Sequence, residues 1–227
     1  MKKKFIKRIK VNNTYFDIYV VSCKLLDFDC YCDNDNHCIY INASLFNNGS
    51  YNNFMFSMLD TMLKVYFIEY NVDYIEDETL LVFLREKLFD IFDNIYDNDL
   101  IGRIEDKFKS EENFSDFVID SVSIMGVNYK ILLNKSNLTH NILGQTNHLD
   151  KIVIIDYSSY NQDELKETIL HEFLHAYFYE CSLHNYCKDE NLIKFIEHIF
   201  FNIIADIWDF NFLIKVEKVS NKLLKVV

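Results

Sequence analysis

Two segments of the chain alternate hydrophobic and polar residues around a tyrosine, and a short run rich in β-branched residues follows each of them. Alternation with a period of two, bounded by Asn and Asp, predicts strands. A long apolar segment without Gly or Pro comes next in both cases, and its length favours a helix. A second helical segment closes each series. The predicted elements are strands at 11–21, 38–44, 124–133 and 152–158, and helices at 57–69, 77–92, 168–180 and 189–203.

The two series repeat each other in the order, type and spacing of their elements. The helices at 57–69 and 168–180 align without a gap at an offset of 111 residues. Such self-similarity is typical of an internal duplication, and biased composition alone is the alternative explanation. Residues 93–118 are charged and polar and form the expected linker. We therefore expect an α+β fold with two related strand-strand-helix-helix halves, residues 1–92 and 119–227.

Composition and charge narrow the class of protein. Of the 227 residues, 50% are hydrophobic and 16% aromatic, which is enough apolar material for a core and excludes disorder as the main state. The formal net charge is -12, from 35 acidic and 23 basic side chains. Such a chain repels phosphate backbones, so we expect no nucleic-acid partner, although a local basic patch can survive.

The start of the chain, MKKKFIKRIK, is basic like the start of a signal peptide. Lys7, Arg8 and Lys10 interrupt the apolar stretch that a signal peptide needs. No run approaches the roughly 18 uncharged apolar residues of a transmembrane helix. We therefore expect a cytoplasmic protein that does not contact a membrane.

The cysteines allow two interpretations. Cys30, Cys32, His37 and Cys38 lie close together and could form a zinc knot. Their spacing differs from the paired CxxC-like pattern of structural zinc sites. Ordinary reduced thiols, as in other cytoplasmic proteins, are the favoured interpretation.

The candidate chemistry lies in His171-Glu172-Phe173-Leu174-His175, an HExxH sequence. Residues four apart share one face of a helix, so the two imidazoles can reach one zinc ion. Glu172 projects beside them and can take a proton from the water that such an ion binds. A chance match in which the pair is merely structural is the alternative.

The surroundings of the motif support a buried helix from about Gln162 to Glu180. Asn161 or Asp163 can cap it, and two glutamates follow in the early turns, where the helix dipole favours acids. Apolar residues cover most of its circumference, which is typical of a buried helix. Two histidines inside such a helix need partners, and a metal supplies them. The apolar residues are Leu165, Ile169, Leu170, Phe173, Leu174, Tyr177 and Phe178.

The strand at 152–156, the HExxH helix and the helix that carries Phe195-Ile-Glu-His-Ile resemble small zincin-type metallopeptidases. The sequence is most similar to ImmA/IrrE-like and related phage-encoded metallopeptidase-like proteins, over about residues 120–205. This resemblance implies a strand along the substrate cleft, an active-site helix with HExxH, and a third zinc ligand on the next helix.

The third ligand has several candidates. A metzincin would have a histidine at the position of Cys181, so that class is excluded. We expect Glu197, because it falls on the apolar stripe of its helix, where a carboxylate is costly unless it is paired or bound to a metal. The alternatives are Glu190, which first-turn dipole effects also explain, and His184 and His198. His198 could instead support a ligand.

The first half lacks the motif. Asp60, Thr61 and Lys64 stand at the positions of His171, Glu172 and His175. A lysine in place of the second imidazole removes a ligand and adds a repelling charge. We expect this half to be a degenerate zincin-like copy that recognises a substrate or partner, or only packs.

These expectations combine into a zinc-dependent peptidase. Zinc is held by His171, His175 and Glu197, and Glu172 is the general base that activates its water. Tyr157, Tyr160 and Tyr179 are candidates for stabilising the oxyanion. The partner is a protein or peptide substrate. The alternative function is a zinc-stabilised phage or mobile-element protein that binds and inhibits a host protein without catalysis.

Overall fold

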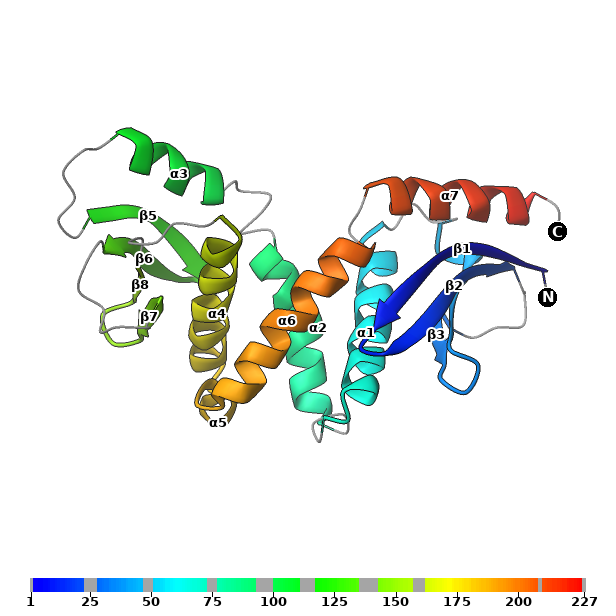
Figure 1. Cartoon of the computed structure of the whole chain (residues 1–227), viewed down its shortest axis with the longest axis horizontal. Coiled ribbons are helices and arrows are strands. Elements are labelled where there is room, and N and C mark those ends of the chain that lie inside the picture. The colour runs from blue at the N-terminus through cyan, green and yellow to red at the C-terminus, as the bar shows by residue number, and fades with distance from the viewer. Residues whose placement is uncertain are drawn as a thin grey trace. The chain divides into compact units, whose positions relative to one another are not determined.

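The computed structural model describes residues 2–22, 28–46, 51–72, 77–92, 100–110, 117–134, 143–156, 162–207 and 210–225. These residues form two compact units, one with residues 1–86 and 199–227 and the other with residues 87–198. Each unit contains one four-stranded sheet and its own helices (Figure 1). The structure is therefore a mixed α+β fold with two similar halves, as the sequence predicted.

The sheet of the first unit has the strand order β1-β2-β4-β3. β1 pairs antiparallel with β2, β2 parallel with β4, and β4 antiparallel with β3. Its inner face is fully apolar, since Phe16, Ile18, Ile39 and Ile41 are all buried. The strands are β1 (Lys2–Val11), β2 (Thr14–Ser22), β3 (Cys30–Asp33) and β4 (Cys38–Asn42).

The sheet of the second unit has the same pairing scheme, with the order β5-β6-β8-β7. Burial again alternates along its strands, as in β6, where Tyr129, Ile131 and Leu133 face the core. The strands are β5 (Phe117–Ile124), β6 (Val127–Asn134), β7 (Gly144–Asn147) and β8 (Ile152–Asp156).

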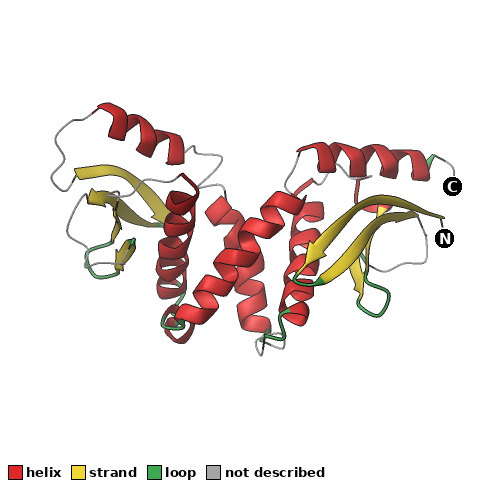
Figure 2. Ribbon diagram, viewed as in Figure 1, coloured by secondary structure: helices red, strands yellow, loops and turns green. Residues whose placement is uncertain are grey.

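The helices follow their sheets along the chain, and Figure 2 distinguishes helices, in red, from strands, in yellow. After the first sheet come the 3-10 helix η1 (Ala43–Phe46), α1 (Tyr51–Glu69), α2 (Glu78–Phe92) and α3 (Leu100–Ser110). After the second come α4 (Gln162–Glu180), the short α5 (His184–Cys187), α6 (Glu190–Ile207) and α7 (Phe210–Leu224). No helix in the described part of the chain is long and apolar enough to span a membrane.

Local irregularities recur at matching places in the two sheets. The first strand of each sheet shifts its register once, between Phe5 and Lys7 in β1 and between Val118 and Asp120 in β5. Residues with positive φ end both long helices: Asn71 follows α1 and Ser182 follows α4. Both helices have 19 residues and lie 111 residues apart. Shared irregularities are harder to explain by biased composition than shared periodicity is, so they support the duplication.

The predicted strand-strand-helix-helix unit was incomplete. Each half has two further strands, β1 and β3 in the first and β5 and β7 in the second. The basic start of the chain is β1, an edge strand in which Lys2, Lys3, Lys4 and Lys10 are exposed, Lys7 pairs with Asp206, and Ile6, Ile9 and Val11 are buried. Charged side chains are common on edge strands, and they mask the alternation of hydrophobic and polar residues by which a strand is predicted.

The units also divide the chain differently from the expected halves, 1–92 and 119–227 with a linker at 93–118. The expected linker contains α3, which contacts β5 and belongs to the second unit. The C-terminal helix α7 contacts β1, β2 and η1 and belongs to the first unit. The two repeats have thus exchanged their last helices, because each of these helices buries its apolar face on the other repeat's sheet.

The HExxH helix α4 is buried as predicted. Its apolar residues are almost completely shielded from solvent on several sides, from Leu165 at 4% exposure to Phe173 at 0%. α4 contacts β7 and β8 of the sheet and the short helix α5. Beyond the motif, Glu180 at its end accepts hydrogen bonds from Tyr129 (2.5 Å) and Lys151 (2.6 Å), which fasten α4 to the sheet. The side chains of the expected caps, Asn161 and Asp163, lie outside the described residues.

Candidate metal centre

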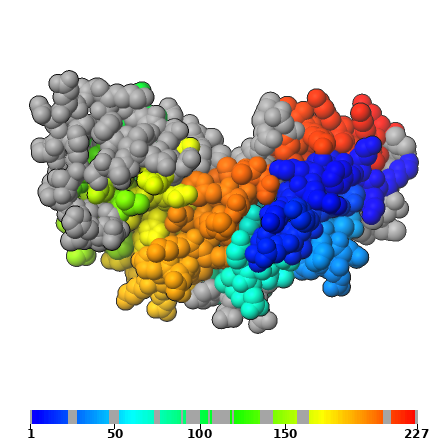
Figure 3. Space-filling view, viewed as in Figure 1, coloured from blue at the N-terminus to red at the C-terminus, as the bar shows by residue number. Residues whose placement is uncertain are grey.

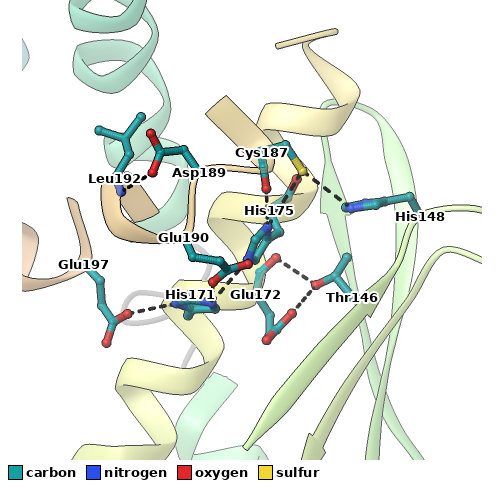
Figure 4. A network of polar contacts seen from close by, with 10 residues as sticks. All are labelled: Thr146, His148, His171, Glu172, His175, Cys187, Asp189, Glu190, Leu192 and Glu197. Carbon is teal, nitrogen blue, oxygen red and sulfur yellow. Dashed lines mark hydrogen bonds and ion pairs between the residues drawn. The ribbon is translucent and has the colours of Figure 1, made fainter. Parts of the chain in front are cut away.

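The two motif histidines lie one turn apart on α4 and point the same way (Figure 4). Their Nε2 atoms are 3.2 Å apart, and both side chains are mostly buried. A third donor comes from Glu190, the first residue of α6. Its Oε2 is 3.4 Å from Nε2 of His171, and its Oε1 is 3.3 Å from Nε2 of His175. His171, His175 and Glu190 thus form a group whose ligand atoms all lie within 4.8 Å of one another.

Local structure places Glu190 at this point. Asp189 caps α6, since its Oδ1 accepts the backbone N–H of Leu192 at 3.0 Å. Glu190 therefore starts the helix and reaches across to the imidazoles, with a side chain that is 59% exposed. Exposure leaves the carboxylate accessible from solvent, as an ion-binding group needs to be.

The outer nitrogens of both rings are held by acceptors. Nδ1 of His171 lies 3.1 Å from Oε2 of Glu197, and Nδ1 of His175 lies 2.9 Å from the backbone oxygen of Cys187. A carbonyl or carboxylate oxygen can only accept, so each Nδ1 carries the proton. In the neutral rings both Nε2 atoms are then bare lone pairs that face each other and a carboxylate. Three such donors repel one another unless a cation lies between them.

The pKa values of the two histidines shift in opposite directions. Burial by itself lowers the pKa of His171, but the hydrogen bond to Glu197 and the nearby carboxylates of Glu172 and Glu190 outweigh it and raise the pKa. Burial and the charge of His171 lower the pKa of His175. The surrounding carboxylates therefore favour a positive charge at this group of donors.

The separations of the three donors match a zinc site. Zinc is bound by nitrogen and oxygen at about 2.0–2.2 Å in tetrahedral geometry, which places neighbouring ligand atoms roughly 3.3–3.6 Å apart. The Nε2–Nε2 distance of 3.2 Å agrees with this, and each imidazole has one of the two Glu190 oxygens at 3.3 or 3.4 Å, with one ligand atom from each residue lying within 4.8 Å of the others. Two imidazoles and one carboxylate are also a donor set that zinc uses in catalytic sites. The residues present thus fit a zinc ion.

Glu190, and not the expected third ligand Glu197, lies at the Nε2 atoms of the two histidines. The two glutamates are seven residues apart on α6, which is roughly 10 Å along a helix. Glu190 lies at the Nε2 atoms, whereas Glu197 reaches His171 from the Nδ1 side and orients the ring. The other two candidates lie elsewhere: His184 packs against Tyr179 with ring centroids 5.0 Å apart, and His198 is exposed.

Glu172, the general base expected from the sequence, lines the same cavity as the two histidines. It is only 4% exposed, and its Oε2 accepts a hydrogen bond of 2.6 Å from Thr146 on β7. Burial raises the pKa of Glu172, while the Thr146 hydrogen bond and His171 oppose the rise. Gly144 packs directly on it, since a Cβ at Gly144 would lie 2.7 Å from Oε1 of Glu172. The carboxylate is therefore held in place from the sheet side.

A cavity of about 740 Å³ opens over the three metal donors and Glu172. β7 forms one side of it, α4 another, and the first turns of α6 a third. Four further carboxylates and Lys194 join Glu172 around the cavity, so its charge is strongly negative. These carboxylates belong to Glu164, Glu167, Glu190 and Glu197.

Sequence reasoning missed the contribution of β7. Gly144, Thr146 and His148 all line the cavity. His148 stacks on Tyr179 at 4.1 Å, and its Nε2 lies 3.7 Å from Sγ of Cys187. One signal was present, because Gly144 is one of only 4 glycines in the chain and a glycine in a strand often marks a close approach. Of the oxyanion candidates, Tyr157 and Tyr160 lie outside the described residues.

The corresponding helix of the first unit carries no such group. Lys64 pairs with Asp60 at 2.9 Å, and Thr61 donates to the backbone oxygen of Ser57 at 2.9 Å. The side chains that replace the motif thus satisfy one another locally.

The alternative zinc knot is not formed in the described part of the chain. There the only group of donors that could share one ion is His171, His175 and Glu190. Cys32 contacts Oδ1 of Asn34 at 3.0 Å, Cys38 contacts the backbone oxygen of Asn36, and the ring of His37 packs on Phe16. Cys30, Cys32 and Cys38 are free thiols.

No family model, no curated protein and no solved structure matches this chain. The resemblance to zincin-type metallopeptidases therefore depends on the HExxH motif and its surroundings. The geometry of the site is the stronger basis for a functional conclusion.

Proposed function

We propose that the protein is a zinc-dependent peptidase. The observation that carries this proposal is the convergence of three possible metal donors, from His171, His175 and Glu190, beside the buried carboxylate of Glu172. A purely structural zinc site usually has a fourth protein ligand and is closed. Here the donors face a cavity, which leaves room for water and substrate.

The bound zinc ion would polarise the substrate carbonyl and make a nearby water more acidic. Glu172 accepts the proton of the attacking water and returns it to the leaving amine. Thr146 and Gly144 hold the Glu172 carboxylate in one orientation, so it is already positioned to accept a proton from the water. Glu197 and the Cys187 carbonyl hold the two imidazoles so that both Nε2 atoms face the ion.

β7 offers a way to position a peptide. It is an edge strand that pairs only with β8 in the sheet of described residues, and it forms one side of the cavity. An extended peptide can add to such an edge through backbone hydrogen bonds. A peptide on the edge of β7 would lie along the cavity that Glu172 also lines.

The test is Glu172→Gln, compared with wild type and with Glu164→Gln as a matched control. Glu164 lies on the same helix, lines the same cavity and is exposed. Zinc content is measured by elemental analysis, and cleavage with a library of fluorogenic peptides and unfolded casein. We expect both variants to retain zinc, while Glu172→Gln alone loses about 10²–10⁴-fold in cleavage.

Zinc-loaded wild-type protein that cleaves nothing in these assays would contradict the peptidase proposal. It would favour the alternative function, a zinc-stabilised protein that inhibits a host protein by binding. Equal losses in Glu172→Gln and Glu164→Gln would show that charge in the cavity matters and that Glu172 is not the base.

A further inference from the structure

The first sheet carries a row of aromatic side chains that no part of the proposed peptidase site uses. One residue from each strand takes part, and neighbours in the row are register partners in the sheet. The ring centroids are 5.7 Å apart between Phe5 and Tyr19, and 5.9 Å between Tyr19 and Tyr40. The row consists of Phe5, Tyr19, Tyr40 and Tyr31.

This row lies on the outer face of the sheet. Flanking residues such as Ile18 and Val20 are fully buried on the opposite face. The two ends of the row, Phe5 and Tyr31, are 47% and 50% exposed. Figure 3 shows the N-terminal strands, in blue, at the surface of the molecule. The face is therefore a wide, solvent-accessible set of ring surfaces.

Positive charge follows the same face. β1 contains six Lys and Arg residues among its ten and no acid, in a chain whose net charge is -12. Nζ of Lys3 lies 4.7 Å from the centre of the Tyr19 ring, and Nζ of Lys10 lies 6.0 Å from that of Tyr15.

Two acids share the outer face, and each has a partner. Asp17 accepts hydrogen bonds from Arg8 at 2.6 and 3.0 Å. Asp33 accepts from the side chain of Asn36 at 2.9 Å. The lysines next to the rings are thus not neutralised by these carboxylates.

The second sheet shows that the fold itself does not require the rings. The row at the matching positions of its register is aliphatic and ends in a glutamine. Its first residue, Val118, is 47% exposed, as is Phe5. β5 has no Lys or Arg. The matched row of the second sheet therefore lacks the rings, and its first strand lacks the basic residues. The matched row consists of Val118, Leu132, Ile154 and Gln145.

We propose that the outer face of the first sheet binds single-stranded nucleic acid. Bases stack on the rings of the row, and the lysines of β1 contact the phosphates. Charge complementarity selects this ligand, because an apolar partner would not need the basic strand and a simple polyanion would not need the rings. The proposal differs from the expectation based on net charge, because it depends on a local basic patch. It is independent of the peptidase proposal.

The test is fluorescence anisotropy of the full-length protein with labelled single strands of about 12 nucleotides, oligo-dT and oligo-rU, at roughly 50 and 200 mM salt. The key variant carries Phe5→Val, Tyr19→Leu and Tyr40→Ile, which are the residues that the second sheet has at these positions. We expect its affinity to fall by about tenfold or more. Phe5→Tyr keeps a ring and should bind like wild type. Leu149→Ala, at an 86% exposed site of the second unit, is the control.

Circular dichroism melting checks that the triple variant is folded, and Phe5→Leu alone replaces it if it is not. Lys3→Gln with Lys10→Gln should reduce the salt dependence while leaving the fold unchanged. The oligo-dT and oligo-rU arms tell DNA from RNA, and binding of either supports the proposal. Absence of binding at low salt would overturn it. So would equal affinity for duplex, polyglutamate or anionic vesicles together with no effect of the aromatic substitutions.

Discussion

Glu190→Gln and Glu197→Gln are a matched pair that separates a metal ligand from a residue that orients one. Both changes are isosteric, remove one charge and lie on the same helix, α6. Glu190 approaches both Nε2 atoms at 3.3 and 3.4 Å, whereas Glu197 contacts only Nδ1 of His171 at 3.1 Å. We expect Glu190→Gln to weaken zinc binding far more than Glu197→Gln.

The geometry sets the expected magnitudes. Loss of an outer partner of a ligand typically costs about 10–100-fold in metal affinity. Glu197→Gln belongs at the lower end, because the amide oxygen can still accept the Nδ1 proton of His171. Glu190→Gln removes an anionic donor from a set of three, so its cost should exceed about 100-fold.

A thermal shift assay converts these factors into a measurable signal. At a free zinc concentration about 100 times the wild-type Kd, binding stabilises the folded state by roughly 2.7 kcal/mol, or about 5–10 °C in Tm. A tenfold weaker Glu197→Gln should retain roughly half of this shift. Glu190→Gln should retain about 1 °C or less. The melting of the metal-free proteins provides the control, and elemental analysis gives the zinc content.

Two outcomes would contradict the assignment of Glu190 as the third zinc ligand. If Glu197→Gln loses the zinc-dependent shift and Glu190→Gln keeps it, Glu197 is the third ligand, as the sequence alone suggested. If neither substitution changes the shift, zinc does not bind at this group of donors.

Three further predictions concern the support of the site. Gly144→Ala places a Cβ 2.7 Å from Oε1 of Glu172, so cleavage should fall while zinc content stays near wild type; unchanged turnover would show that the position of the carboxylate is not critical. Partial burial acts to raise the pKa of Glu180, but the hydrogen bonds from Lys151 and Tyr129 lower it overall. The stabilisation from Glu180 is therefore complete above the ordinary glutamate pKa of about 4.3, and it is lost as the pH falls through the lower pKa of the folded state. Denaturant unfolding should show that Glu180→Gln has a smaller free energy of unfolding than wild type at neutral pH, and that this difference shrinks in acid. Phe173→Ala should cost about 3–5 kcal/mol in denaturant unfolding, since Phe173 is fully buried in α4, and a loss below 1 kcal/mol would contradict its place in the core.

The exchange of the last helices explains why the compact units differ from the halves expected from the sequence. α3 and α7 end their repeats in sequence, yet each belongs to the unit that contains the other repeat's sheet. The apolar face of a helix indicates that the helix packs on a sheet, but it does not indicate which of two similar sheets it packs on. Because the chain contains two copies of one unit, such an exchange has a low free-energy cost, as in domain swapping.

The sequence by itself determined what local chemistry controls. The spacing of apolar residues located the long helices, including α4, and the four-residue separation of His171 and His175 placed both imidazoles on one helical face. The offset of 111 residues indicated the two copies, and Lys64 indicated that one copy has no metal donors. None of these conclusions needed a contact between distant residues.

Only the tertiary structure decided the remaining features, because each depends on residues that are far apart in the chain. The choice of Glu190 over Glu197 depends on where α6 begins relative to α4. The support of Glu172 by Thr146 depends on β7 pairing with β8 beside the motif helix. The aromatic row depends on the register of four strands, which a sequence pattern with a period of two cannot specify across strands.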